Sequence, residues 1–246
     1  MVLVFDVSSD LAMFRKSYTT TSAVSFPFPP PTALAGLIGA ICGLKHGSNS
    51  SASSARFWKE MSGMRVAVGI KRPIRWFTTA VNLMKFKTPN ASMGEHIQVK
   101  HQFAKMPKYR VYVEGDTEVY RTLRKCLKEG RFVYTPYLGL AFCIADVEFL
   151  GEFETEPVFF EENSRINIDT VLPDYGEVEV DVLATGGVHR EVVPFRMDEN
   201  RRLEETVTVF YPHVSQESSC HLVLSKQGQV DITAVGSEKV AWFRPW

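Results

Sequence analysis

Cysteine is scarce in this sequence, with four among 246 residues and no CxxC pair. Such scattered positions supply neither the four ligands of a structural zinc site nor the paired framework of a disulfide-stapled domain. We therefore expect reduced, buried thiols and a cytoplasmic location. The four residues are Cys42, Cys126, Cys143 and Cys220.

Long apolar runs are also missing. No stretch reaches the roughly 18 residues that a membrane-spanning helix requires. Residues 1–10, MVLVFDVSSD, lack a basic leader and are typical of a β-strand. We therefore expect no membrane partner and no secretory signal.

Several catalytic patterns are absent as well. The glycines at positions 36, 39 and 43 form neither a GxGxxG fingerprint nor a GxxxxGK[ST] phosphate loop. His96 and His101 lie five positions apart without a third ligand nearby, and zinc requires three or four. Spacing suggests no Ser-His-Asp set. We expect no metal and no cofactor.

The chain also lacks a net charge, because 28 Lys and Arg balance 28 Asp and Glu, but the two signs are separated along the sequence. Residues 56–110 carry twelve Lys and Arg against two Glu, whereas residues 146–205 carry seventeen Asp and Glu against five Arg. This separation favours a polyanionic partner for the basic segment, unless the two segments pair within the molecule. Aromatic rings among the cations favour base stacking beside phosphate neutralisation: Trp58, Trp76, Phe77, Phe86, Phe103 and Tyr109.

The most distinctive stretch is residues 25–45, SFPFPPPTALAGLIGAICGLK. Three prolines hold its start extended, and Thr32 is placed to cap a helix that runs to about Leu44. Apolar residues recur on one face of this helix. A second face carries Gly36, Gly39, Ala40 and Gly43, which predicts close packing against a sheet or a sugar-phosphate backbone.

Secondary-structure signals divide the chain into two parts. Residues 1–150 are predicted to contain strands at 2–7, 64–72, 109–113 and 140–149 and helices at 32–44 and 116–130. This β-α-β-β-α-β order is typical of an α+β ferredoxin-like, RRM-like domain. Residues 151–246 are predicted to form a smaller β-sheet subdomain, with strands at 165–168, 177–183, 189–194, 205–211 and 230–233. The tail at 242–246, WFRPW, is either a docking element or a core-sealing strand.

Residues 73–107 show no clean periodicity, and they are basic and aromatic. An irregular segment of this length in a domain is usually functional or disordered. We predict a protruding hairpin with arms at 82–86 and 96–101.

The first strand, the PPPTALAGLIGAICG helix, the basic segment, the strand PKYRVYV and the turn YLGL occur in this order. This arrangement resembles the Cas five family of CRISPR-associated proteins, RAMP-superfamily subunits of the type I complex Cascade. Two segments, NIDTVLP at 167–173 and VPFR at 193–196, resemble the I-B branch most.

The resemblance implies a non-catalytic antiviral subunit that binds the 5′ repeat-derived handle of the CRISPR RNA (crRNA) next to the large subunit. Its thumb, residues 78–106, would lie at the start of the guide beside target DNA and the first backbone subunit. The implied RNA contacts are Arg15, Lys16, Tyr18, Thr19, Thr32, Lys45, His46, Lys71, Arg72, Arg75, Lys85, Lys87, Lys100, His101, Gln102, Tyr137 and Gly139.

One branch of the family cleaves its own repeat with Tyr, Lys and His. Lys100 and His101 are the candidates here, because metal-free cleavage needs a base, an acid and a cation. The tyrosine of that branch comes from near the end of the first helix, where this chain has Cys42 and Gly43. We therefore expect RNA binding without catalysis. The alternatives are a metal-independent endoribonuclease and a protein–protein adaptor that binds through its acidic half.

Overall fold

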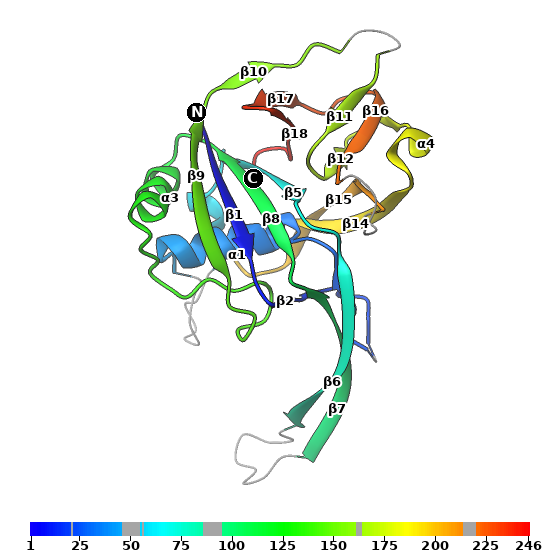
Figure 1. Ribbon diagram of the computed structural model, residues 1–246. Helices are drawn as coiled ribbons and strands as arrows, with labels where there is room; N and C mark the ends of the chain where they lie inside the picture. The colour runs from blue at the N-terminus through cyan, green and yellow to red at the C-terminus, as the bar shows by residue number, and fades with distance from the viewer. Residues whose placement is uncertain (21, 46–54, 56, 86–94, 161–163, 214–219) are drawn as a thin grey trace.

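The computed structural model describes residues 1–20, 22–45, 55, 57–85, 95–160, 164–213 and 220–246 (Figure 1). At its centre lies a four-stranded antiparallel sheet in the order β5-β8-β1-β9. Helix α1 (Pro31–Cys42) lies between β1 and β5 in the chain, and α3 (Glu118–Glu129) between β8 and β9. The predicted order of strands and helices is confirmed. The strands are β1 Val2–Ser8, β5 Arg65–Ile70, β8 Lys108–Glu114 and β9 Asp146–Phe153.

Protein covers both faces of β1. Leu3, Phe5 and Val7 belong to the large apolar core that also contains the buried side chains of α1 and α3. Val2 and Val4 belong to a second cluster with residues of the C-terminal strands. Alternate residues of a strand point to opposite faces, so the sheet is the middle layer of three.

Helix α1 begins differently from the prediction. Pro30 is the N-cap and Pro31 the first helical residue, and no side chain caps the helix. The carbonyl of Pro30 accepts from the N–H groups of Ala33 and Leu34 at 2.8 and 3.0 Å. The fixed φ of Pro31 suits the first helical position, which moves Thr32 inside the first turn. Gly43, in the left-handed conformation, ends the helix at Cys42 rather than at Leu44.

Two other predicted boundaries, the start of the second long helix and the start of the fourth strand, were also wrong. The Thr117 side chain caps α3, so this helix begins at Glu118 rather than at Asp116, although it ends at Gly130 as expected. The fourth strand begins at Asp146 instead of Leu140, because residues 136–145 fold back on themselves. In that turn Leu138 donates to the Cys143 carbonyl at 2.8 Å.

The predicted hairpin is confirmed and is longer than expected. Strands β6 (Arg75–Lys85) and β7 (Glu95–Lys105) pair in register over their full lengths and project from the body (Figure 1). Strand β2 (Leu11–Ala12) joins the base of β7. These two strands overlap the segment 78–106 for which the resemblance implies a thumb, and from here on we use the name thumb for β6 and β7.

The C-terminal part is rich in strands, as predicted, but residues 177–183 are not one strand. Strand β13 (Glu179–Val180) is followed by α4 (Val182–Thr185), which Asp181 caps by accepting from Ala184 N–H at 2.9 Å. The other strands are β10 Thr155–Pro157, β11 Ile166–Ile168, β12 Leu172–Asp174, β14 Val188–Met197, β15 Leu203–Pro212, β16 Leu222–Lys226, β17 Ile232–Val235 and β18 Glu238–Ala241.

Of the two roles open for the C-terminal tail, the structure supports core sealing. Trp242, Phe243 and Trp246 are all buried, although no strand continues beyond Ala241. Three short elements complete the fold: β3 Phe14–Arg15, β4 Ser25–Phe26 and α2 Phe57–Glu60. Within the described part of the chain, no helix is long and apolar enough to cross a membrane.

Candidate nucleic-acid interface

Two adjoining hollows lie beside the exposed face of α1. The smaller, about 320 Å³, is lined by Gly36, Ala40, Tyr134 and Tyr137, and we call it the glycine hollow. The larger, about 830 Å³, is lined by Arg15, Ser17, Thr32 and Arg201 among others, and we call it the arginine hollow. The two hollows share four lining residues and are therefore continuous: Phe14, Ala33, Phe57 and Gly139.

Four residues that the sequence nominated meet here. Arg15, Thr32 and Gly139 line the arginine hollow, and Tyr137 lines the glycine hollow with Gly139. They come from β3, α1 and the turn before β9, which are far apart in the sequence. The fold thus joins separate motifs into one surface.

Gly139 fixes the wall that the two hollows share. Its φ is +88°, and a Cβ on this residue would lie 1.8 Å from the carbonyl oxygen of Met13. Met13 N–H in turn donates to the Leu138 carbonyl at 3.1 Å. Only glycine permits this approach of two backbones, so Gly139 positions Tyr137 relative to β3.

The charge of the hollows is of one sign. Among the described residues, their lining contains Arg15 and Arg201 and no acidic residue, although the chain has 28 Asp and Glu. Arg15 is exposed, and its guanidinium donates to the Thr19 carbonyl at 3.2 Å. A phosphate group would meet a cation here without a competing carboxylate.

The loop after Arg15 is anchored to the C-terminal part. Glu191 on β14 forms an ion pair with Lys16 and accepts a hydrogen bond from Tyr18 at 3.2 Å. Its second oxygen accepts from Tyr211 at 3.2 Å. Thr19 closes the turn by donating to the Lys16 carbonyl at 2.7 Å. Lys16 is therefore already neutralised, whereas Arg15 has no carboxylate partner among the described residues.

On the thumb, Lys100 and His101 point to opposite faces, because they are consecutive in a strand. Lys100 is exposed, whereas His101 is 8% exposed and stacks on Phe103. The His101 Nδ1 lies 2.9 Å from the Val99 carbonyl oxygen. The two side chains therefore do not converge on one phosphate. Gln102 accepts a hydrogen bond from Ser25 N–H at 3.3 Å and fastens the thumb to β4.

Two cations lie directly opposite each other at the base of the thumb. Arg75 on β6 pairs in register with Lys105 on β7, and both are exposed. Like charges in this position destabilise a strand pair. A bound polyanion would relieve that repulsion.

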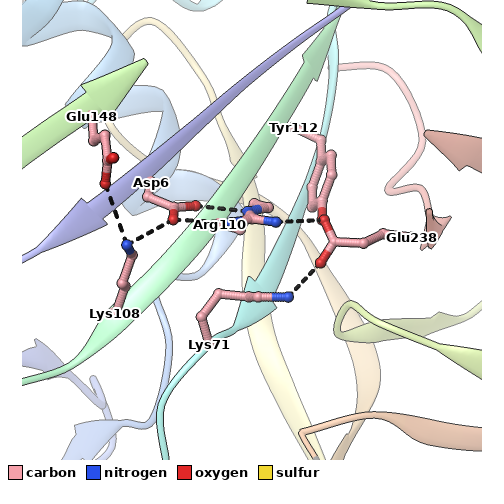
Figure 2. A network of polar contacts seen from close by, with 7 residues as sticks. All are labelled: Asp6, Lys71, Lys108, Arg110, Tyr112, Glu148 and Glu238. Carbon is pink, nitrogen blue, oxygen red and sulfur yellow. Dashed lines mark hydrogen bonds and ion pairs between the residues drawn. The ribbon is translucent and has the colours of Figure 1, made fainter. Parts of the chain in front are cut away.

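Other basic residues of the segment 56–110 form ion pairs within the protein. A polar network behind the central sheet joins Lys71 and Arg110 to Glu238, and Arg110 to Asp6 (Figure 2). Likewise, Lys59 pairs with Glu199 and Arg65 with Asp231. These cations are therefore neutralised inside the molecule, but of the carboxylates in these pairs only Glu199 belongs to the acidic segment 146–205.

The remaining nominated residues lie apart from the hollows. Arg72 is exposed between β5 and β6, and Lys45 is exposed just after α1. The backbone of Lys85 ends β6. His46 and Lys87 lie outside the described residues.

Sequence reasoning missed Tyr134 and Arg201 as lining residues. The tyrosine had a usable signal, because Tyr134 and Tyr137 bracket a Thr-Pro turn. Arg201 had none, since it lies within the acidic segment and only the fold brings it to α1.

Cys42 stands where the cleaving branch of the family is expected to carry its tyrosine. Burial, with a smaller contribution from Cys126, raises the pKa of the Cys42 thiol to about 12. Such a thiol stays protonated and does not act as a nucleophile. Among the described residues, no group of three His, Cys, Asp or Glu side chains could hold a metal ion.

Solved structures of CRISPR proteins share this fold. A crystal structure of a CRISPR protein from Archaeoglobus fulgidus superposes with a TM-score of 0.55 at 18% identity, over 98% of this chain and 99% of that one. A chain of a CRISPR RNA-guided surveillance complex also gives 0.55, at 16% identity, over 86% and 90%. A chain of the type III-B Cmr-beta complex bound to cognate target RNA gives 0.50 at 11% identity, over 91% and 86%.

Family membership follows from the sequence itself. The family model described as CRISPR-associated protein (Cas_Cas5) matches residues 2–209. The chain belongs to the Cas5 family of CRISPR-associated proteins. None of the curated proteins matches it.

Proposed function

We propose that this protein is a non-catalytic subunit of a type I CRISPR effector complex and that it binds the 5′ handle of the crRNA. The observation that carries the proposal is the pair of continuous hollows, whose described lining residues include two arginines and no Asp or Glu. Single-stranded RNA is bound by neutralising phosphates and by stacking splayed bases on aromatic rings. Arg15 would serve the first purpose, and Tyr134 and Tyr137 the second.

The proposed architecture is a ferredoxin-like RNA-binding domain over residues 1–150 and a β-rich subdomain over residues 151–246. The strand order β5-β8-β1-β9 with α1 and α3 as crossovers supports the first part. A separate apolar cluster drawn from β11, β12, β16 and β17 supports the second.

The thumb would lie beside the first guide–target pairs, with the large subunit and the first backbone subunit as neighbours. Both of its faces combine apolar and polar side chains. One face carries Phe77, Val81, Leu83, Ile97 and Val99 together with Arg75, Thr79 and Lys105. The other carries Thr78, Asn82, His96, Gln98, Lys100 and Gln102 together with the exposed Trp76 and Met84. The I-B branch is the proposed subtype, on the segments at 167–173 and 193–196.

The separation of the Lys100 side chain from the His101 side chain favours RNA binding over RNA cleavage.

The test of the proposed function is binding of a labelled repeat-derived RNA across a salt series without metal, with the RNA length followed over time. We expect intact RNA and an affinity that falls steeply with salt. Shortened RNA would indicate the endoribonuclease instead. An absence of binding, even with partner subunits present, would leave only the adaptor.

A further inference from the structure

Glu191 lies on β14, and side chains from distant parts of the chain meet at its carboxylate. Lys16 forms an ion pair with Oε1, Tyr18 donates to the same oxygen at 3.2 Å, and Tyr211 donates to Oε2 at 3.2 Å. We infer that Glu191 is a positioning residue, which holds Arg15 ready for a phosphate of the bound RNA. This inference rests on the proposed function and gives the C-terminal part of the chain a role in it.

The ion pair of Glu191 is largely withdrawn from solvent. The exposed fractions of the Lys16 and Glu191 side chains are 16% and 11%. The Lys16 ammonium also lies 5.2 Å from the centre of the Phe26 ring. Solvent and salt screen such a pair less than a surface pair, and leaving one partner alone is costly. Lys16 is therefore held inward rather than offered to a ligand.

The direction of Lys16 fixes that of Arg15. Strand β3 pairs with β4, and Lys16 continues this ladder, because its N–H donates to the Val24 carbonyl at 2.8 Å. Successive side chains of an extended strand point to opposite faces. In keeping with this alternation, Phe14 is buried and Arg15 is exposed. With Lys16 held inward, Arg15 faces outward, where it lines the arginine hollow.

The turn after Lys16 orients the guanidinium of Arg15. The N–H and the hydroxyl of Thr19 both donate to the Lys16 carbonyl, at 3.2 and 2.7 Å. Nη2 of Arg15 donates to the Thr19 carbonyl at 3.2 Å. A side chain that is already held in this way loses less conformational freedom on binding than a free one. A short series of contacts thus connects Glu191 to Arg15 through Lys16 and Thr19.

The charge of Glu191 makes the inference testable by the direction of an effect. A carboxylate near a polyanion repels it, so removing the charge should by itself strengthen RNA binding. A positioning residue gives the opposite result, because Arg15 is no longer held in place when the carboxylate is lost. Weaker binding after the loss of a negative charge is therefore the signature of positioning.

The experiment is a double-mutant cycle, with fluorescence anisotropy of a labelled repeat-derived RNA as the measure of affinity. Arg15→Gln should weaken binding about tenfold, because it removes a charge-assisted contact. Glu191→Gln should weaken binding about fivefold, since Arg15 stays present but is less ordered. In the Arg15→Gln background, Glu191→Gln should have no further effect, because it acts through Arg15.

Glu156→Gln is the matched control for the change of charge. Glu156 is an exposed residue of β10 and lines neither hollow. Its replacement removes the same charge from the C-terminal part of the chain without touching the loop at 15–19. This variant should bind RNA at least as tightly as wild type.

Folding is checked by thermal unfolding of every variant. Glu191→Gln should unfold at a lower temperature than wild type, because it leaves Lys16 without its partner. Should that variant not fold, Tyr211→Phe carries the test. It removes only the hydroxyl that donates to Glu191 and keeps the ring that packs against Phe28. Tyr211→Phe should weaken RNA binding about twofold, and not in the Arg15→Gln background.

The outcomes separate this inference from the proposed function. If Glu191→Gln binds RNA as well as wild type or better while Arg15→Gln weakens binding, Glu191 does not position Arg15, and handle binding stands. Equal losses from Glu191→Gln with and without Arg15 would show that the carboxylate acts through the stability of the fold, which also overturns the inference. If wild type binds no RNA alone or in the complex, the proposed function itself fails.

Discussion

The guanidinium of Arg110 donates hydrogen bonds to both carboxylate oxygens of Asp6, from Nε to Oδ1 at 2.7 Å and from Nη2 to Oδ2 at 3.1 Å. Asp6 lies in β1 and is only 2% exposed. The same guanidinium donates to Glu238 at 2.9 Å, and so connects the central sheet to β18 (Figure 2). Arg110, a cation of the basic segment 56–110, thus holds two parts of the fold together.

This network predicts that acid destabilises the protein. Burial opposes ionisation of Asp6, but hydrogen bonds from Arg110 and Lys108 outweigh it and lower the pKa. In Glu238, burial is likewise outweighed by Lys71, Tyr112 and Arg110, so its pKa is lowered too. A carboxyl with a lowered folded-state pKa stabilises the fold above its unfolded pKa of about 4. We expect the free energy of unfolding in urea to fall as the pH drops below about 5.

Asp6→Asn tests the contribution of one carboxylate. Removing one partner of a buried pair typically costs about 3–5 kcal/mol at neutral pH, and the variant should lose part of the acid dependence. Glu148→Gln is the control, because its side chain is 66% exposed and meets Lys108 at 3.3 Å. The Glu148→Gln variant should lose less than about 1 kcal/mol of the free energy of unfolding. Equal acid dependence in wild type and Asp6→Asn would contradict the assignment.

Gly139→Ala should destabilise the protein more than Gly130→Ala. Both glycines have positive φ, but only Gly139 would bring a Cβ against backbone, 1.8 Å from the Met13 oxygen. At Gly130 nothing lies within 4 Å, so alanine costs about 1–2 kcal/mol there. Urea denaturation measures both. RNA affinity should fall for Gly139→Ala, because the turn carrying Tyr137 must move. Equal losses of stability would show that the close approach is not maintained in solution.

Lys100→Gln should reduce the salt dependence of RNA binding, whereas Lys71→Gln should not. Lys100 is exposed and forms no ion pair with the described residues, whereas Lys71 is paired with Glu238. Each neutralised phosphate on single-stranded RNA contributes about 0.7 to the slope of log affinity against log salt. Fluorescence anisotropy at several salt concentrations gives that slope. An unchanged slope for Lys100→Gln would remove this lysine from the interface.

His101→Ala should lower stability without changing RNA length. The ring is buried against Phe103 and lies 2.9 Å from the Val99 carbonyl, so its loss removes packing and a hydrogen bond together worth about 1–2 kcal/mol. Gel analysis of repeat RNA incubated without metal provides the readout. Cleavage by wild type that disappears in His101→Ala would revive the endoribonuclease.

Much of the fold was predictable because local patterns dominate it. The helix stop at Gly130 and the buried strand β5 follow from local sequence signals. The hairpin was predicted only in part, with arms at 82–86 and 96–101, whereas its strands pair over 75–85 and 95–105. A predicted boundary was wrong where two local signals competed. At the start of α1, Pro31 favours the first helical position whereas Thr32 favours the cap, and the structure follows Pro31. The predicted strand start at Leu140 was wrong because hydrogen bonds fold residues 143–145 back onto residues 136–140, and strand propensity carries no information about such contacts.

The sequence by itself determined which side chains were available: small residues on one helix face, a Tyr-Thr-Pro-Tyr turn and a basic, aromatic thumb. Tertiary structure alone decided which cations remain for a ligand. Lys16 and Lys71 meet Glu191 and Glu238, about 170 positions away, whereas Arg15 meets no carboxylate in the described chain. Ion pairing depends on distance in space, and composition carries no information about it.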